Sequence, residues 1–255
     1  MNIIKTSREI KIMRENGKIL ASIVSDLEKK VKVGVSGKEL DDFAEEQIRS
    51  YSAVPSFKNY GEESGDPFPY TICFSLNEEV VHGFPTEKKI IQDGDLVKID
   101  IGLKKNGYHA DMARTFCVGE VSQEKKDIMK YVCKSLLAGL KAIKDGAKMS
   151  DYSKAVQKYA ESKGYSVVRD LVGHGIGQEL HESPQIPNYF GKHFYDFELK
   201  AGMTLALEPM INEGTFGVKV ASDGWTYVTN DGQLSAHWEN TILVTKNGCE
   251  ILTSV

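Results

Sequence analysis

A repeated order of elements constrains how this chain can fold more than any other feature of its sequence. Gly34 and Gly146, which each follow helix-like sequence, lie 112 residues apart, and the stretches DGDLVKID and AGMTLALE lie 108 residues apart. Each stretch has a glycine, an apolar run and a carboxylate six residues after the glycine. No linker rich in proline or serine divides the chain. We therefore predict a single domain over 1–255 with two related halves, about 1–120 and 121–255.

Capping signals and apolar spacing place helices and strands within these halves. Thr6 with Glu9 and Ser36 with Glu39 have the spacing of a capping box, and apolar residues recur at helical spacing after both. We expect helices over 6–34, 36–48, about 122–143 and about 150–162. We expect strands within 71–81, 96–103 and 166–168, and a loop over 55–70.

Composition and charge exclude several classes of protein. Hydrophobic residues make up 41% and charged residues 27% of the chain, as in ordinary globular proteins. The net charge of −4 provides no general attraction to nucleic acid or to an anionic membrane. The charged N-terminus and the absence of a long apolar run predict neither a signal peptide nor a membrane span. The four cysteines form no CxxC pair, which argues against a zinc–thiolate site and predicts a reducing, cytoplasmic location.

Four carboxylates lie in or beside apolar runs, where a charged group needs a partner. Asp100 follows LVKI, Glu208 follows TLAL, Asp111 lies in GYHADMARTF, and Glu239 lies in SAHWENTILV. For any one of them, a strand end or a helix N-cap is an equally good interpretation. Four such residues together predict a shared site.

The turn sequence KKNG relates two of these carboxylates to each other. Asn-Gly is the strongest short signal for a hairpin. With Asn106 and Gly107 at the centre of the turn, Asp100 faces Ala113, and Asp111 lies diagonal to Asp100 on the same face. Their backbones would be about 7–8 Å apart. Two carboxylates reaching inward from there can share a metal or a metal pair, and without a cation both could not easily stay ionised.

The stretch VGHGIGQELHESP places two histidines, His174 and His181, seven positions apart. They could be two ligands of one metal, a ligand and a residue with another role, or two surface histidines. Four carboxylates and one imidazole form an oxygen-rich set whose charge two divalent cations would neutralise. Such ligands suit manganese, ferrous iron or cobalt, and a pair of metals about 3.5–4 Å apart is a known hydrolytic device.

The ordered motifs of the chain resemble those of type I methionine aminopeptidases in their short, bacterial-type form. They are PSFKNY, NEEVVHGFP, DGDLVKIDIG, GYHADMARTF, GHGIG, LHESPQIPNY, MTLALEPMI and SAHWENT. The resemblance implies an α/β (α+β) pita-bread fold, with two pseudo-symmetric halves around a central antiparallel sheet. It also implies a metal-dependent hydrolase that removes the initiator methionine from nascent proteins when the second residue is small. In that family, a water or hydroxide that bridges two divalent metal ions carries out the hydrolysis.

The same resemblance implies a set of metal ligands in this chain. The ligands would be Asp100, Asp111, His174, Glu208 and Glu239, with Asp111 and Glu239 bridging the two ions. The ions would be cobalt, manganese, iron or zinc. A monovalent cation, sodium or potassium, would lie near the loop of Asn77 and the backbone of Ser235.

Further roles carried over from the family concern the substrate. His82 would hydrogen-bond the substrate backbone, His181 would assist the carbonyl as charge develops, and Glu208 would act as general base. A pocket for the methionine side chain would be built from Tyr60, Phe68, Cys73, Leu180 and Trp225. Ordinary core packing is the competing interpretation of this pocket set.

Some positions depart from the usual pattern of the family. Leu180 stands where many bacterial relatives have an aromatic residue, and His237 stands where glutamine is common. His237 and His109 each lie two residues before an expected ligand, and we expect neither to bind metal. The loop at 61–67 is slightly long.

Two other enzyme classes and one binding class compete with this interpretation. A proline-specific aminopeptidase or prolidase shares the fold but usually carries a sizeable N-terminal domain. A creatinase-like enzyme needs no metal, which the complete ligand set argues against. A metal-free binding protein on this fold, working through RNA or protein contacts, would typically have lost ligands. The expected partners are N-terminal Met-Xaa peptides of nascent proteins, with transient ribosome contact, a monomeric state, no membrane and no specific nucleic acid.

Overall fold

The structure, a computed structural model, describes residues 3–191 and 195–254. The helices are α1 (Ser7–Lys30), α2 (Gly37–Ser50), α3 (Gln123–Leu140) and α4 (Met149–Glu161), with a short 3-10 helix η1 (Glu62–Ser64). The strands are β1 (Val54–Pro55), β2 (Ile72–Leu76), β3 (Glu79–Val81), β4 (Leu96–Lys105), β5 (Tyr108–Cys117), β6 (Ser166–Val167), β7 (Gly173–Gly175), β8 (Glu182–Ile186), β9 (Thr204–Leu207), β10 (Met210–Asn212), β11 (Val218–Val220), β12 (Tyr227–Thr229), β13 (Ser235–His237), β14 (Asn240–Thr245) and β15 (Gly248–Ile251).

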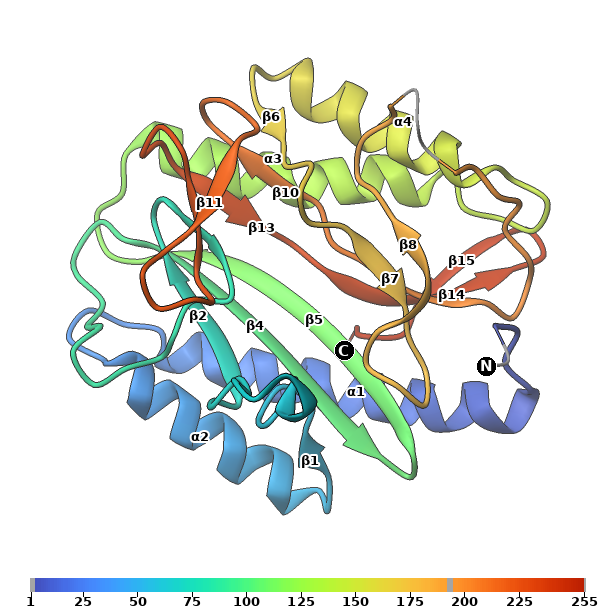
Figure 1. Cartoon of the computed structure of the whole chain (residues 1–255), viewed down its shortest axis with the longest axis horizontal. Helices are drawn as coiled ribbons and strands as arrows, with labels where there is room; N and C mark the ends of the chain where they lie inside the picture. Colours follow the sequence, from blue (N-terminus) through green and yellow to red (C-terminus); the bar gives the residue numbers. More distant parts are fainter. Residues whose placement is uncertain (1–2, 192–194, 255) are drawn as a thin grey trace.

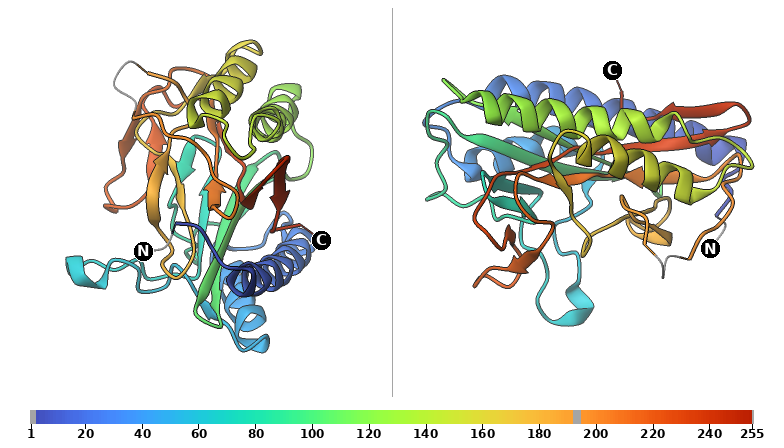
Figure 2. Two further views of the ribbon diagram at one scale, coloured as in Figure 1. Left: turned by 90° about the vertical axis from the view of Figure 1, so that its right-hand side faces the viewer. Right: turned by 90° about the horizontal axis from the view of Figure 1, so that it is seen from above.

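Two helix pairs flank a set of antiparallel strands. In Figure 1, α1 and α2 lie below the long strands β4 and β5, and α3 and α4 lie above them. Viewed from above in Figure 2, α1 and α3 run along one side of the strands, and the loop around η1 and the β11–β12 hairpin project from the other. α1 and α3 therefore cover one face of the strands.

Each helix pair closes its own apolar core. Residues of α1 and α2, such as Leu27 and Leu40, pack with Phe74 of β2 and Ile99 of β4. Residues of α3 and α4 pack instead with β9 and β14. These separate clusters support our proposal of one domain with two related halves.

The two predicted capping boxes are present. The side chains of Thr6 and Ser36 accept hydrogen bonds from the backbone N–H groups of Glu9 and Glu39, whose carboxylates accept from the cap residues in return. These contacts satisfy N–H groups that the first turn of a helix leaves unpaired. α1 and α2 accordingly begin at Ser7 and Gly37, one residue after the predicted caps.

The predicted hairpin register is confirmed. Asn106 and Gly107 have φ of 52° and 83°, the left-handed conformation that a tight hairpin turn requires. β4 and β5 pair with Asp100 opposite Ala113 and Asp111 opposite Gly102. Asp100 lies within β4 rather than at its end, because β4 continues to Lys105, beyond the predicted strand.

A second sheet carries the remaining carboxylates toward this hairpin. Its strand order is β15-β14-β9-β7-β8, and Glu208 directly follows β9. Several contacts join it to β5. The N–H of Glu239 donates to the carbonyl of Ala113 at 3.0 Å, and the Thr241 hydroxyl donates to the carbonyl of Asp111 at 2.8 Å. The two sheets therefore meet beside the predicted ligands.

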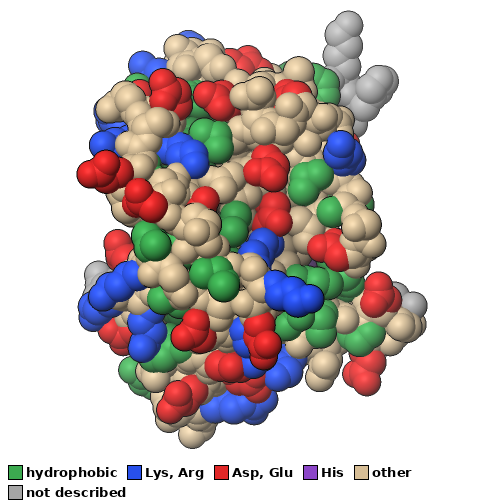
Figure 3. Space-filling model, turned by 90° about the vertical axis from the view of Figure 1, so that its left-hand side faces the viewer, with side chains coloured by type: hydrophobic (Ala, Val, Ile, Leu, Met, Phe, Trp, Pro, Cys, Tyr) green, Lys and Arg blue, Asp and Glu red, His purple; other side chains and the backbone are tan. Residues whose placement is uncertain are grey.

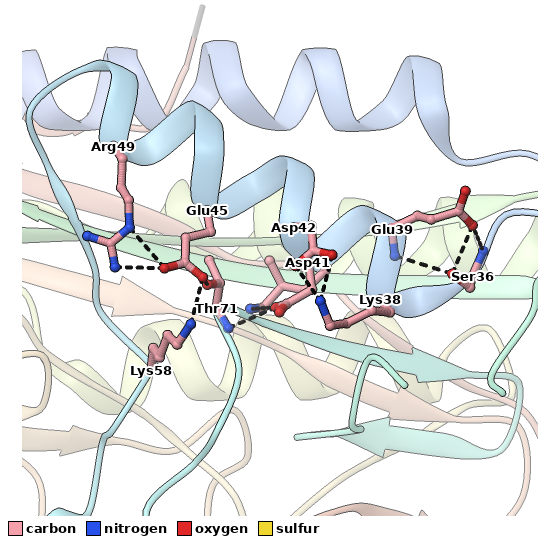
Figure 4. A network of polar contacts seen from close by, with 10 residues as sticks. Ser36, Lys38, Glu39, Asp41, Asp42, Glu45, Arg49, Lys58 and Thr71 are labelled. Atoms are coloured by element: carbon pink, nitrogen blue, oxygen red, sulfur yellow. Dashed lines mark hydrogen bonds and ion pairs between the residues drawn. The ribbon is translucent and has the colours of Figure 1, made fainter. Parts of the chain in front are cut away.

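Polar contacts of α2 hold the loop that precedes β2. The carboxylate of Asp41 accepts hydrogen bonds from the backbone N–H groups of Thr71 and Ile72, and Lys58 of the loop forms an ion pair with Glu45 (Figure 4). Burial raises the pKa of Asp41 to about 6, although the two N–H donors oppose that shift. The loop is thereby anchored at both ends to one helix.

Several helix boundaries differ from those predicted: α1 ends at Lys30 rather than 34, and α2 ends at Ser50 rather than 48. α3 ends at Leu140, earlier than the predicted 143, and the chain to Gly146 forms turns in which Gly146 donates to the carbonyl of Leu199 at 2.8 Å. α4 begins at Met149, one residue earlier than predicted. Among the described residues, no helix is long and apolar enough to cross a membrane.

The contact between α3 and α4 depends on Gly139. A Cβ atom at this position would lie 2.6 Å from ring atoms of Tyr152 and from Val156. We expect Gly139→Val to lower the free energy of unfolding by about 1–3 kcal/mol, because overpacking forces the helices apart. Urea denaturation measures this change. Gly248→Val is the matched control, since open space surrounds that position, and a loss equal to that of Gly139→Val would contradict the packing argument.

Candidate metal centre

One pocket collects the residues that the sequence singled out. It encloses about 520 Å³, its open mouth included, a size typical of small-molecule sites. All five expected metal ligands, both expected substrate histidines and all five expected pocket residues line it. The lining residues are Phe57, Tyr60, Phe68, Cys73, His82, Asp100, Asp111, His174, Leu180, His181, Glu208, Trp225 and Glu239.

The ligand side chains come from both sheets. Asp100 and Asp111 lie on the β4–β5 hairpin, and His174 lies on β7, where it pairs with Ala206 of β9. Glu208 follows β9, and Glu239 lies between β13 and β14. Only the meeting of the two sheets brings these five side chains into one pocket.

The donor atoms fit a cation. Ligand atoms of Asp111, His174 and Glu239 all lie within 4.8 Å of one another. A buried carboxylate oxygen on each of Asp100, Asp111 and Glu239 has no hydrogen-bond partner in the described part of the chain. Unpartnered buried oxygens are costly, so a divalent cation accounts for all three at once.

The single imidazole is oriented for this purpose. Nδ1 of His174 lies 2.8 Å from the carbonyl oxygen of Gly175, to which it can donate only as N–H. Nε2 then carries the lone pair and faces Glu208, 3.6 Å from Oε1. Burial, with the neighbouring His181, lowers the pKa of His174 to about 3, which keeps the ring neutral as a ligand must be.

The carboxylates shift one another's protonation in the absence of a cation. Burial raises the pKa of Asp100 to about 7. Burial also raises the pKa of Asp111, Glu208 and Glu239 well above the ordinary value, and the charges of neighbouring carboxylates add to the shift. Both effects disfavour the ionised form, and a bound cation would reverse them.

Two more histidines line the pocket beside the expected ligands. His82 has a φ of 58° and packs edge-on against Tyr227, with ring centroids 5.7 Å apart. Burial lowers its pKa to about 4, so its imidazole is neutral near pH 7. The ring of His181 lies 4.4 Å from that of His174, and its Nδ1 lies 2.5 Å from the hydroxyl of Tyr60.

Aromatic and aliphatic side chains form one wall of the pocket. Phe68 is buried and meets Trp225 edge-on, with ring centroids 5.3 Å apart. Cys73 and Leu180 are buried, and Cys73 stands opposite Asp100 in the β2–β4 register. Tyr60 is 41% exposed and therefore belongs to the mouth of the pocket rather than to its floor.

The two unusual histidines differ in their contacts. Nδ1 of His109 lies 2.8 Å from the hydroxyl of Ser56, and His109 does not line the pocket. Nε2 of His237 lies 3.7 Å from Oε2 of Glu208 and has no hydrogen-bond partner among the described residues. His237 thus approaches an expected ligand.

Sequence reasoning missed two contributors to the site. Phe57 lines the pocket, and its place in the motif PSFKNY was the signal that could have found it. Arg114 lies three residues after Asp111 and donates to the carbonyl of Glu239 at 2.5 Å. No sequence pattern pairs residues that lie 125 positions apart.

Comparisons with known proteins find similarity to metallopeptidases over nearly the whole chain. The sequence profile of metallopeptidase family M24 matches residues 11–246. Methionine aminopeptidase 1 of Bacillus subtilis is 48% identical over 255 residues, all of both chains. The crystal structure of methionine aminopeptidase from Thermotoga maritima superposes with a TM-score of 0.95 at 42% identity, and it covers 100% of each chain. An Xaa-Pro dipeptidase from Bacillus anthracis superposes with a TM-score of 0.77 at 28% identity, but this chain spans only 62% of it.

The raised carboxylate pKa values predict that metal binding releases protons. At pH 7 the metal-free pocket retains protons that a divalent ion would displace, so we expect Mn²⁺ to release at least about one proton per chain. Calorimetric titration in two buffers with different ionisation enthalpies measures this number, and equal heats in both would contradict it.

Because the folded-state pKa of Asp100 is raised, its contribution to the stability of the metal-free protein falls as pH rises from about 4 toward 7.

Proposed function

This chain belongs to metallopeptidase family M24, and we propose that it removes the N-terminal methionine from proteins whose second residue is small. The observation that carries the proposal is the single pocket in which a complete set of metal donors faces an apolar wall. Full-length similarity to named methionine aminopeptidases supports the same reaction, and the antiparallel core between helix pairs is the pita-bread fold of such relatives.

Five residues are proposed to hold two divalent metal ions. They are Asp100, Asp111, His174, Glu208 and Glu239, with Asp111 and Glu239 shared between the two ions; the three unpartnered carboxylate oxygens support this set. The ions would be cobalt, manganese, iron or zinc, all of which accept oxygen and imidazole donors. When bound, they would lower the pKa of a water and polarise the scissile carbonyl.

The proposed roles of the other side chains follow from their contacts. Glu208 lies between the imidazoles of His174 and His237, with its carboxylate oxygens 3.6 and 3.7 Å from their Nε2 atoms, and once ionised it would take a proton from water. Nδ1 of His181 would accept a hydrogen bond from the Tyr60 hydroxyl, 2.5 Å away, so that Nε2 would carry the ring proton and donate it toward the substrate carbonyl. The neutral ring of His82 would hydrogen-bond the substrate backbone.

The apolar wall is proposed to receive the methionine side chain. An unbranched thioether packs well against aromatic faces and aliphatic groups. Phe68, Cys73, Leu180 and Trp225 would surround it, and Tyr60 would close the mouth of the pocket. Leu180 in place of an aromatic residue would leave this wall less rigid.

Prolidase activity is the main alternative within the family. Over this chain, the Thermotoga maritima methionine aminopeptidase superposes with a TM-score of 0.95 at 42% identity, whereas the Bacillus anthracis Xaa-Pro dipeptidase superposes with 0.77 at 28% identity. The difference supports methionine rather than proline specificity.

The proposed partners are N-terminal Met-Xaa peptides, with transient ribosome contact by a monomer in the cytoplasm. The face drawn in Figure 3 bears acidic and basic side chains interspersed rather than one basic patch. With a net charge of −4, such a surface favours short-lived contact over tight binding to nucleic acid.

Cleavage of short peptides tests the proposed activity. Chelator-treated protein should not cleave Met-Ala-Ser, and Mn²⁺ or Co²⁺ should restore cleavage, because the hydrolysis needs the ions. Leu-Ala-Ser and Ala-Pro are the controls and should remain uncut, with products followed by chromatography. Cleavage that ignores the chelator, or faster cleavage of Ala-Pro, would contradict the proposal.

Two substitutions separate metal binding from turnover. His174→Ala should weaken metal binding at least about tenfold, because it removes the one imidazole donor. His181→Ala should leave two ions bound and lower kcat about 10²-fold, because it removes a donor to the developing charge. Metal analysis and steady-state kinetics distinguish them. Equal loss of metal in both variants would refute this division of roles.

A further inference from the structure

A lysine is buried behind the candidate metal centre. Lys98 lies on β4, two residues before Asp100, and only 2% of it is exposed. Its amino group donates to the backbone carbonyl of Asn77 at 2.8 Å and to that of Ser235 at 3.0 Å. A fully buried lysine is rare and needs partners of this kind.

These contacts join three segments that each lead into the pocket. β4 reaches Asp100 two residues after Lys98. The turn at Asn77 leads through β3 to His82, and β13, which begins at Ser235, leads to Glu239. The Lys98 amino group therefore fixes the spacing between the strands that position two candidate ligands and a candidate substrate histidine.

The partners of Lys98 are those that a monovalent cation prefers. Backbone carbonyl oxygens replace the hydration shell of such an ion in proteins. The Asn77 turn is itself held in place: the Asn77 residue has a φ of 46°, and its side-chain amide donates to Asp95 at 2.8 Å. Burial lowers the pKa of Lys98 to about 7, and the carboxylates of Glu79 and Glu78 oppose that shift. The amino group can donate to both carbonyls in either protonation state.

We infer that the amino group of Lys98 occupies the position of a monovalent cation, so that this chain needs neither sodium nor potassium at the Asn77–Ser235 site. Lys98 is a positioning residue, which acts on the reaction through the segments that carry the pocket residues. The hydrolysis measurements below rest on the proposed function, whereas the measurements of thermal stability do not.

The test removes the amino group and asks whether a free ion replaces it. Lys98→Ser opens space beside the two carbonyls, whereas Lys98→Met fills much of the same space with an apolar chain. Thermal unfolding of the metal-free proteins is compared in KCl, NaCl and choline chloride at equal ionic strength. The manganese-loaded proteins are assayed on Met-Ala-Ser in the same salts.

The wild-type midpoint should be the same in all three salts within about 1 °C. Lys98→Ser should unfold earlier in choline chloride and recover by at least about 3 °C in KCl or NaCl, with hydrolysis recovering in parallel. Lys98→Met should be destabilised in every salt without recovery. Lys125→Ser is the matched control. The amino group of Lys125 also donates to Asn77, but to its side-chain oxygen, and Lys125 is only half-buried. This variant should therefore show no salt-specific recovery.

Three results would overturn the inference. The first is a wild-type unfolding midpoint that is higher in KCl or NaCl than in choline chloride. The second is a Lys98→Ser protein whose unfolding midpoint is the same in all three salts. The third is a Lys98→Ser protein that does not fold in any of the three salts. The predicted stability pattern together with no hydrolysis by the wild-type protein would support the inference and count against the proposed function instead.

Discussion

The crowding of carboxylates around one imidazole is the constraint on which the rest of the structure depends. Asp100, Asp111, Glu208 and Glu239 share one pocket, and burial raises the pKa of each of them. The charges of neighbouring carboxylates raise the pKa values of Asp111, Glu208 and Glu239 further. In water these groups would separate. The fold holds them together against this tendency. A cation that binds all four groups is stabilised because folding has already overcome the cost of bringing them close.

The scaffold resists this repulsion with contacts behind the pocket. The Thr241 hydroxyl accepts from the N–H of Asp111 and donates to its carbonyl, at 3.0 and 2.8 Å. The Arg114 guanidinium donates to the carbonyls of Ala113 and Glu239 and lies over the ring of Trp238. The amino group of Lys98 adds a third such tie. Each joins the hairpin to segments of the second half, so each opposes separation of the ligands.

Local patterns predicted a large part of this architecture. The capping boxes at Thr6 and Ser36 located the starts of two helices, because an N-cap is satisfied within four residues of the chain. The turn at Asn106 and Gly107 predicted the β4–β5 register and with it the relation of Asp100 to Asp111. The motifs resembling methionine aminopeptidases predicted the family, the fold and, apart from Phe57, the residues that line the pocket. Boundaries such as the end of α3 were less certain, because packing and turns decide them.

The sequence by itself determined which residues could form helices, the hairpin and the ligand set, since these depend on neighbours along the chain or on motifs written in it. Only the tertiary structure decided that His237 faces Glu208, that Arg114 binds the carbonyl of Glu239, and that Lys98 contacts the carbonyls of Asn77 and Ser235. The reason is physical: these contacts join segments far apart in the chain. Their partners exist only after both sheets have packed, and the cost of burying a charge then depends on what surrounds it.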